Sequence, residues 1–188
     1  NNPDLKAQGW NDWIPPTQEE VFKRIENYKE KWSKHEMKIL KGICAVLGLK
    51  FKRNAIDVYI VSGNPRQLSA PIVIKSGFNP DEFINSLTHE LIHTLFQDNG
   101  RRIPMSIFDE MFPGETHSVK SHVVLHSVLK YIYLDILKDK KKLEINISSS
   151  KNHETNDYIR AWEIVEKEGY IEIIKKFKSK IKRGLSVF

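Results

Sequence analysis

Apolar residues recur every three to four positions along most of this chain, the spacing of one face of an α-helix. The first such stretch starts after Thr17, which is followed by acidic residues that favour a helix start, and continues to about Leu47, where Gly48 favours a helix end. The pattern leaves open whether this stretch is one helix or two. Residues 1–16 contain prolines and tryptophans without any period, and we expect them to form an extended lead-in.

Two short stretches have the β-branched and aromatic composition of strands, residues 56–61 and 71–75. The second begins with a proline, which fits an edge strand or the first residue of a strand. The tetrapeptide at 79–82, Asn-Pro-Asp-Glu, then predicts a helix start with Asn79 as N-cap. That helix is expected to run to about Gln97.

The second half of the chain is predicted to be helical with two interruptions. Residues 100–114 are expected to form a loop, and residues 115–138 the next helix. Residues 142–151 are polar and are expected to break the helical pattern. A basic C-terminal helix is predicted over residues 155–188, with Gly169 as a point at which it can be interrupted. The sequence therefore predicts a single α+β domain over residues 1–188, because no segment has the composition of a linker.

The chemistry is concentrated in one predicted helix, where His89, Glu90 and His93 form an H-E-x-x-H motif. Residues four apart lie on one face of a helix, so the two imidazoles can bind the same tetrahedral zinc ion. Glu90 lies about 100° around the helix from His89, which follows from 3.6 residues per turn. It is therefore placed to accept a proton from a water held by the metal rather than to bind the metal itself.

A catalytic zinc ion needs a third protein ligand and one open position. The next predicted helix offers Glu115, His122 and His126, which share one face if the helix begins at Glu115. A polar side chain on such an apolar segment needs a partner or a ligand. His122 and Glu115 are the two candidates for the third ligand. His126 is a candidate to orient a ligand or to donate a hydrogen bond to a substrate carbonyl, or else an ordinary half-buried histidine.

The motif together with a following ligand helix resembles the zincin metallopeptidases. His89, Glu90 and His93 carry the resemblance, and residues 121–126 (Ser-His-Val-Val-Leu-His) are similar to the segment that follows this motif in small archaeal and phage-type zincin domains. Phe96 and Asn99 stand where metzincins have Gly and a third His, so the chain does not resemble that subgroup.

The resemblance implies a zincin-like fold in which a small sheet precedes the active-site helix. In that fold the strand before the helix, here 71–75, is an edge strand along which an extended peptide binds. The resemblance also implies one catalytic zinc ion, held by His89, His93 and His122. Glu90 is then the catalytic residue, acting as general base and afterwards as general acid, and the implied activity is hydrolysis of protein or peptide substrates.

Composition narrows the alternatives. The single cysteine, Cys44, excludes an internal disulfide framework and a cysteine zinc ribbon. No apolar run is long enough to span a membrane, and the sequence predicts a cytoplasmic protein. The net charge is +6, and the segment 175–183 contributes six cations. A basic helix of this kind is also found in proteins that bind nucleic acid or acidic surfaces.

The sequence therefore predicts a zinc-dependent peptidase, with hydrolysis of another amide as the next alternative. A second class is an inactive or regulatory binding module that zinc only stabilises. A third is a protein that binds nucleic acid or an acidic surface through segment 175–183. The sequence makes no prediction of the oligomeric state.

Overall fold

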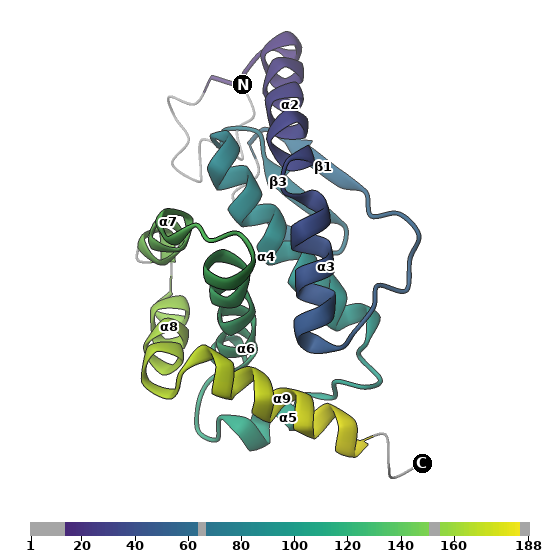
Figure 1. The fold of residues 1–188 in the computed structure, drawn as a ribbon. Coiled ribbons are helices and arrows are strands. Elements are labelled where there is room, and N and C mark those ends of the chain that lie inside the picture. Colours follow the sequence, from purple (N-terminus) through teal and green to yellow (C-terminus); the bar gives the residue numbers. More distant parts are fainter. Residues whose placement is uncertain (1–13, 64–66, 151–154, 185–188) are drawn as a thin grey trace.

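The computed structural model of this chain describes residues 14–63, 67–150 and 155–184, which form a mostly helical α+β fold (Figure 1). The predicted class is therefore confirmed at this level. The described elements, in chain order, are α2 (Gln18–Ser33), α3 (Glu36–Leu47), β1 (Val58–Val61), β2 (Leu68–Ser69), β3 (Ile72–Lys75), α4 (Pro80–Asp98), α5 (Met105–Met111), α6 (His117–Tyr131), the π-helical turn η1 (Ile132–Ile136), α7 (Lys140–Ser150), α8 (Asp157–Glu168) and α9 (Tyr170–Gly184). The predicted lead-in falls largely on residues 1–13, which lie outside the described residues.

The small sheet has the strand order β1-β3-β2 among the described residues. Strand β1 runs parallel to β3, and β2 runs antiparallel to it. The prediction that the strand at 71–75 is an edge strand is therefore wrong, because β3 is the central strand. Strand β2 is too short to show a pattern in the sequence, yet it pairs with β3 at Ile72 and Val73. Ile72 and Ile74 are buried on the side of the sheet that packs against α4.

Helix α4 begins as the sequence predicts. The Asn79 side chain accepts hydrogen bonds from the backbone N–H groups of Asp81 and Glu82, at 2.9 and 3.0 Å. The Glu82 carboxylate in turn accepts the backbone N–H of Asn79, at 2.8 Å, which completes a capping box. The cap residue, which lies ten residues before His89, sets where the helix starts. In Figure 1, α4 runs through the middle of the molecule, with the sheet and α2 on one side and α6 on the other.

Several predicted element boundaries differ from the observed ones. The first helical stretch, for which the pattern left one helix or two open, is a pair of helices, α2 and α3; its end at Gly48, in the left-handed conformation with φ 67°, is as predicted. The predicted loop at 100–114 contains the short helix α5. Helix α6 begins at His117 rather than Glu115, because Thr116 caps it by accepting the backbone N–H of Val119 at 3.1 Å. It does not continue as an α-helix to Lys138 but passes into the π-helical turn η1.

The predicted polar break at 142–151 is wrong, since most of it lies in helix α7. Its N-terminal turn is held by Lys142, which is only 8% exposed. The Lys142 ammonium pairs with Asp139 of the same segment and with Asp81 of α4, each at 2.9 Å. Lys31 of α2 also pairs with Asp81, at 3.1 Å. A helix without a long apolar face is thus attached to the molecule by charges that the local pattern does not reveal.

This charge cluster predicts a specific pH dependence. The hydrogen bond from Lys142 holds the pKa of Asp81 below its usual value. A lowered pKa in the folded state adds stability above the pKa of the unfolded chain, near 3.9, and this is lost as the pH falls through the folded value. We expect Asp81→Asn to be less stable than the wild type at pH 7, with the difference in free energy of unfolding disappearing towards pH 2.

Urea unfolding at a series of pH values measures this difference directly. Asp57→Asn is the matched control, because Asp57 is exposed and forms no ion pair among the described residues. Its curve should run parallel to that of the wild type. A gap between wild type and Asp81→Asn that stays constant from pH 7 to pH 2 would show that the charge of Asp81 contributes nothing.

The C-terminal region at 155–188 is two helices rather than one. The break falls at Gly169, whose φ of 83° is a conformation that glycine adopts at little cost. Helix α9 then crosses the lower part of the molecule in Figure 1 and packs on α6 and α5. Its apolar positions Ile173, Phe177 and Ile181 are buried, as their helical spacing predicts.

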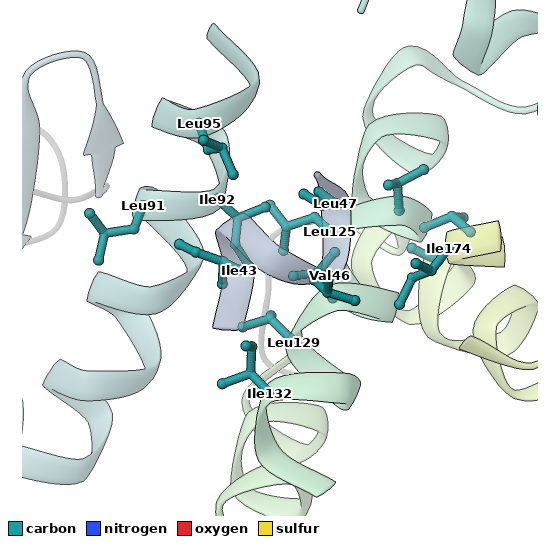
Figure 2. Packing of buried hydrophobic residues seen from close by; sticks show 14 of the residues in the cluster. Ile43, Val46, Leu47, Leu91, Ile92, Leu95, Leu125, Leu129, Ile132 and Ile174 are labelled. Atoms are coloured by element: carbon teal, nitrogen blue, oxygen red, sulfur yellow. The ribbon is translucent and has the colours of Figure 1, made fainter. Parts of the chain in front are cut away.

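The core lies where α3, α4, α6 and α9 meet, and Figure 2 shows part of it. Its labelled side chains come from α3 (Ile43, Val46, Leu47), α4 (Leu91, Ile92, Leu95), α6 (Leu125, Leu129), η1 (Ile132) and α9 (Ile174). This packing fixes α6 against α4, the two helices that carry the predicted metal ligands. No helix in the described part of the chain combines the length and apolar character needed to cross a membrane.

Candidate metal centre and its cleft

Three histidines converge between α4 and α6. The Nε2 atoms of His89 and His93 are 3.1 Å apart, and one ring nitrogen of His122 completes a set in which all ligand atoms lie within 4.8 Å of one another. Two nitrogens bound to the same tetrahedral zinc ion lie about 3.3 Å apart, given zinc–nitrogen distances of about 2.0–2.1 Å. The spacing of the two α4 histidines therefore matches that of two ligands of one ion.

The orientation of His122 also suits a metal ligand. Its Nδ1–H donates to the backbone carbonyl oxygen of Ser118, one turn earlier in α6, at 2.7 Å. Because a carbonyl oxygen can only accept, this hydrogen bond selects the tautomer with the lone pair on Nε2. Metal-binding histidines commonly have their second ring nitrogen held in this way.

The alternative third ligand, Glu115, lies elsewhere. It precedes the cap of α6, so it does not share the helical face of His122. Its carboxylate accepts two hydrogen bonds from the Arg160 guanidinium, at 2.7 and 3.1 Å. Among the described residues, the group of possible metal ligands contains His122 and does not contain Glu115.

Burial keeps His93 and His126 neutral, which is the form of histidine that binds metals. It lowers the pKa of His93 to about 3, with a further contribution from the neighbouring His122. Burial likewise places the pKa of His126 well below its usual value. The His126 ring is 1% exposed and stacks on Trp162 of α8, with centroids 4.4 Å apart. His126 is outside the group of three converging ligands but borders the same cleft.

Glu90 is the acidic group closest in sequence to the three histidines and is almost completely buried, at 7% exposure. Burial raises its pKa to about 7, because a carboxylate loses its hydration there. Together with His89, it lines a cleft of about 400 Å³. A carboxyl group with a pKa near neutrality can both accept and release a proton at physiological pH.

The cleft brings in residues that the sequence analysis did not select. Tyr158 of α8 packs against the histidines, with its ring centroid 4.3 Å from that of His122 and 5.8 Å from that of His89. Burial, together with the nearby carboxylates of Glu90 and Asp157, raises the pKa of Tyr158 to about 12. Its hydroxyl therefore stays protonated and can donate a hydrogen bond. Nothing in the local sequence places Tyr158 beside a motif almost seventy residues earlier.

Asn85 also lines the cleft, and its spacing from the motif in the sequence predicts this position. Asn85, His89 and His93 are spaced four residues apart, so they follow one face of α4. The Asn85 carbonyl oxygen accepts a hydrogen bond from the Tyr133 hydroxyl of η1, at 2.6 Å. The π-helical turn thus supports a side chain that faces the candidate site.

Three of the six cations in the basic segment at 175–183 form ion pairs with acidic side chains of the protein itself. Lys175 pairs with Glu172, and Lys176 pairs with Glu168 of α8, at 2.7 and 3.1 Å. Lys180 pairs with Glu110 of α5. These pairs account for three of the charges that suggested an acidic partner, while binding of nucleic acid or an acidic surface stays a prediction.

No protein-family model, curated protein or solved structure matches this chain. The geometry of the site therefore has to support any functional conclusion. It combines three converging imidazoles with a buried carboxyl group and a protonated phenol, and His89, Glu90 and Tyr158 line one cleft. Such a set can bind a divalent cation and move a proton beside it.

Proposed function

We propose that this protein is a zinc-dependent peptidase of the zincin type. The observation that carries the proposal is the convergence of His89, His93 and His122 beside a cleft that His89 and Glu90 line. Three imidazoles suit zinc, and three protein ligands are the number found in catalytic zinc sites. The hydrogen bond from His122 to Ser118 supports the same assignment, because it orients the ring as a ligand.

In this proposal the residues of the chain move the proton and hold the substrate. When bound, zinc would supply Lewis-acid chemistry, which makes water more acidic and polarises a carbonyl oxygen. Glu90 accepts the proton from the attacking water and passes it to the leaving amine. Tyr158, whose ring packs against those of His89 and His122, is the proposed hydrogen-bond donor to the carbonyl oxygen as negative charge develops on it.

The sheet supports binding of an extended peptide, although β3 is not an edge strand along its whole length. Among the described residues, β2 pairs with β3 only at Ile72 and Val73. Among the residues that the structure describes, none forms a strand paired with Ile74 or Lys75 on that side, and Lys75 borders the cleft. A peptide can add there as a short strand that leads towards the three histidines.

Metal content tests the ligand assignment. We expect the wild-type protein to bind about one zinc ion per chain. Glu115→Ala should retain it, because Glu115 is bound to Arg160. His122→Ala should weaken zinc binding by more than the roughly 10- to 100-fold that loss of an outer partner causes. Elemental analysis and competition with a zinc chelator measure both variants, and circular dichroism checks that they fold.

The peptidase assignment requires cleavage as well as zinc. Digestion of a mixed peptide library, followed by mass spectrometry, should show zinc-dependent products that a chelator abolishes. Stoichiometric zinc in His122→Ala, with loss of zinc in Glu115→Ala, would contradict the proposed ligand set. Absence of any cleavage by the zinc-loaded wild-type protein would overturn the peptidase proposal.

A further inference from the structure

We propose that Lys75 binds a carboxylate of the substrate, so that the cleft selects peptides with a negative charge close to the scissile bond. This inference rests on the proposed peptidase function and adds a substrate class to it. The carboxylate has two sources in a peptide, the C-terminus and an Asp or Glu side chain. The two sources predict different products, and the experiment below separates them.

Lys75 lies at the end of the central strand, beside the candidate site. It is the last residue of β3, paired with Val61 of β1, and it lies four residues before the cap of α4. Its half-buried side chain lines the same cleft as His89 and Glu90. The cleft, at about 400 Å³, is of the size that holds one small ligand. A group bound to Lys75 therefore belongs to the same substrate molecule as the bond near Glu90.

The charge of Lys75 is not balanced by an ion pair within the described part of the chain. Among the described residues, no acidic side chain forms an ion pair with Lys75, whereas Lys142, Lys31 and Lys130 each have at least one acidic partner. The nearest acid in sequence that also lines the cleft is Glu82, and its carboxylate accepts the backbone N–H of Asn79 in the helix cap. A half-buried ammonium group is more stable with an anionic partner. The substrate is the natural source of that partner.

The remaining wall of the cleft supports a polar ligand. Most of its other side chains are uncharged and polar, and they come from α4 and α7 as well as from the segment before β2: Gln67, Asn85, Ser86, Asn146, Ser149 and Ser150. Phe78 is the main apolar side chain among the described lining residues, apart from the Tyr158 ring. Such a wall gives little affinity for large apolar groups and can donate hydrogen bonds to a carboxylate.

The test compares peptides that differ only in one charge. The two peptides of the first pair differ only at the C-terminus, which is a free carboxylate in one and an amide in the other. In the second kind of pair both C-termini are amidated, and the two peptides differ by Glu or Gln at one position. Such a pair is made for each position in turn. We expect the zinc-loaded protein to favour the carboxylate member of one pair by about 10-fold or more in kcat/KM, mainly through KM, as a charge-assisted hydrogen bond provides. A carboxylate preference within the first pair identifies the C-terminus as the group that Lys75 binds. A carboxylate preference within the second kind of pair identifies an acidic side chain.

Charge reversal then assigns the preference to one residue. Lys75→Glu should abolish the preference for the carboxylate peptide and favour a Lys-containing one. Lys38→Glu is the matched control, because it changes the net charge equally but lies exposed on α3 and does not line the cleft. It should retain the wild-type preference. The proposal would be overturned if Lys75→Glu kept the carboxylate preference. It would also be overturned if the wild type showed no carboxylate preference.

Peptide binding to a variant that cannot cleave separates this inference from the peptidase proposal. Affinities of the same peptides for zinc-loaded Glu90→Gln, measured by calorimetry, should show the same preference, and the additional Lys75→Glu change should remove it. Equal affinities for the charged and neutral peptides overturn the role of Lys75 even if the wild type cleaves both. A preference in binding, without cleavage by the wild type, supports Lys75 and overturns the peptidase activity.

Discussion

Glu90→Gln is expected to lower kcat by about 100- to 10,000-fold, the contribution usual for a general acid–base group. Glutamine has nearly the same shape as glutamate, but its amide cannot accept the proton of the attacking water. Because Glu90 is not among the three converging ligands, the variant should still bind one zinc ion per chain. Its stability should not fall, since a neutral amide loses less hydration than a carboxylate in a site that is 7% exposed.

Three measurements on the same preparation test this prediction: turnover of a cleaved peptide, zinc content and urea unfolding. Glu115→Gln provides the control, since it removes the same charge near the start of α6 at a residue that pairs with Arg160. Its kcat should stay close to that of the wild type. Loss of zinc from Glu90→Gln would show that Glu90 helps to hold the metal. Wild-type turnover in that variant would exclude Glu90 as the general base.

Phe177→Ala is expected to lower the free energy of unfolding by about 3–5 kcal/mol, as truncation of a fully buried phenylalanine does. The Phe177 ring is 0% exposed. It lies 5.8 Å from the ring of Phe96 in α4 and 5.4 Å from that of Phe108 in α5, measured between centroids. The loss is a large part of the roughly 5–15 kcal/mol by which a domain is usually stable. It would loosen α9 from the helix that carries the H-E-x-x-H motif.

Ile171→Ala is the matched control in the same helix, because Ile171 is 37% exposed and its truncation leaves little cavity. We expect it to cost about 1 kcal/mol or less. Chemical unfolding followed by circular dichroism compares the two variants with the wild type. Similar small effects for both would mean that α9 contributes little to the core. The basic segment 175–183 would then need a role other than packing.

Local patterns were sufficient for several elements of the fold. The capping box at Asn79 and the left-handed Gly48 are determined by residues within a few positions, and both appear where the sequence predicts them. The break at Gly169 is of the same kind. Two helices were missed because their stability depends on distant contacts. Helix α7 is polar but is held by Lys142 against Asp81, some sixty residues away.

The edge-strand prediction failed for a related reason. Pro71 fits an edge strand or the first residue of a strand, and the resemblance to zincins implied an edge strand, but whether a strand is central depends on what pairs with it. Strand β2 has only two residues, so it produces no periodic signal, and still it covers half of one side of β3. Helical spacing made Glu115 a candidate ligand, whereas in the structure Thr116 caps the helix after it and Arg160 of α8 binds its carboxylate.

For the candidate site, the sequence by itself determined what a single helix can determine. The 3.6-residue repeat places His89 and His93 on one face of α4 and Glu90 beside them, whatever the rest of the molecule does. Only the tertiary structure decided that His122 joins them, because α6 must pack against α4 in one particular orientation. It also decided that Tyr158 and Lys75 border the same cleft. Their positions follow from packing between elements far apart in the chain, and local periodicity carries no information about such contacts.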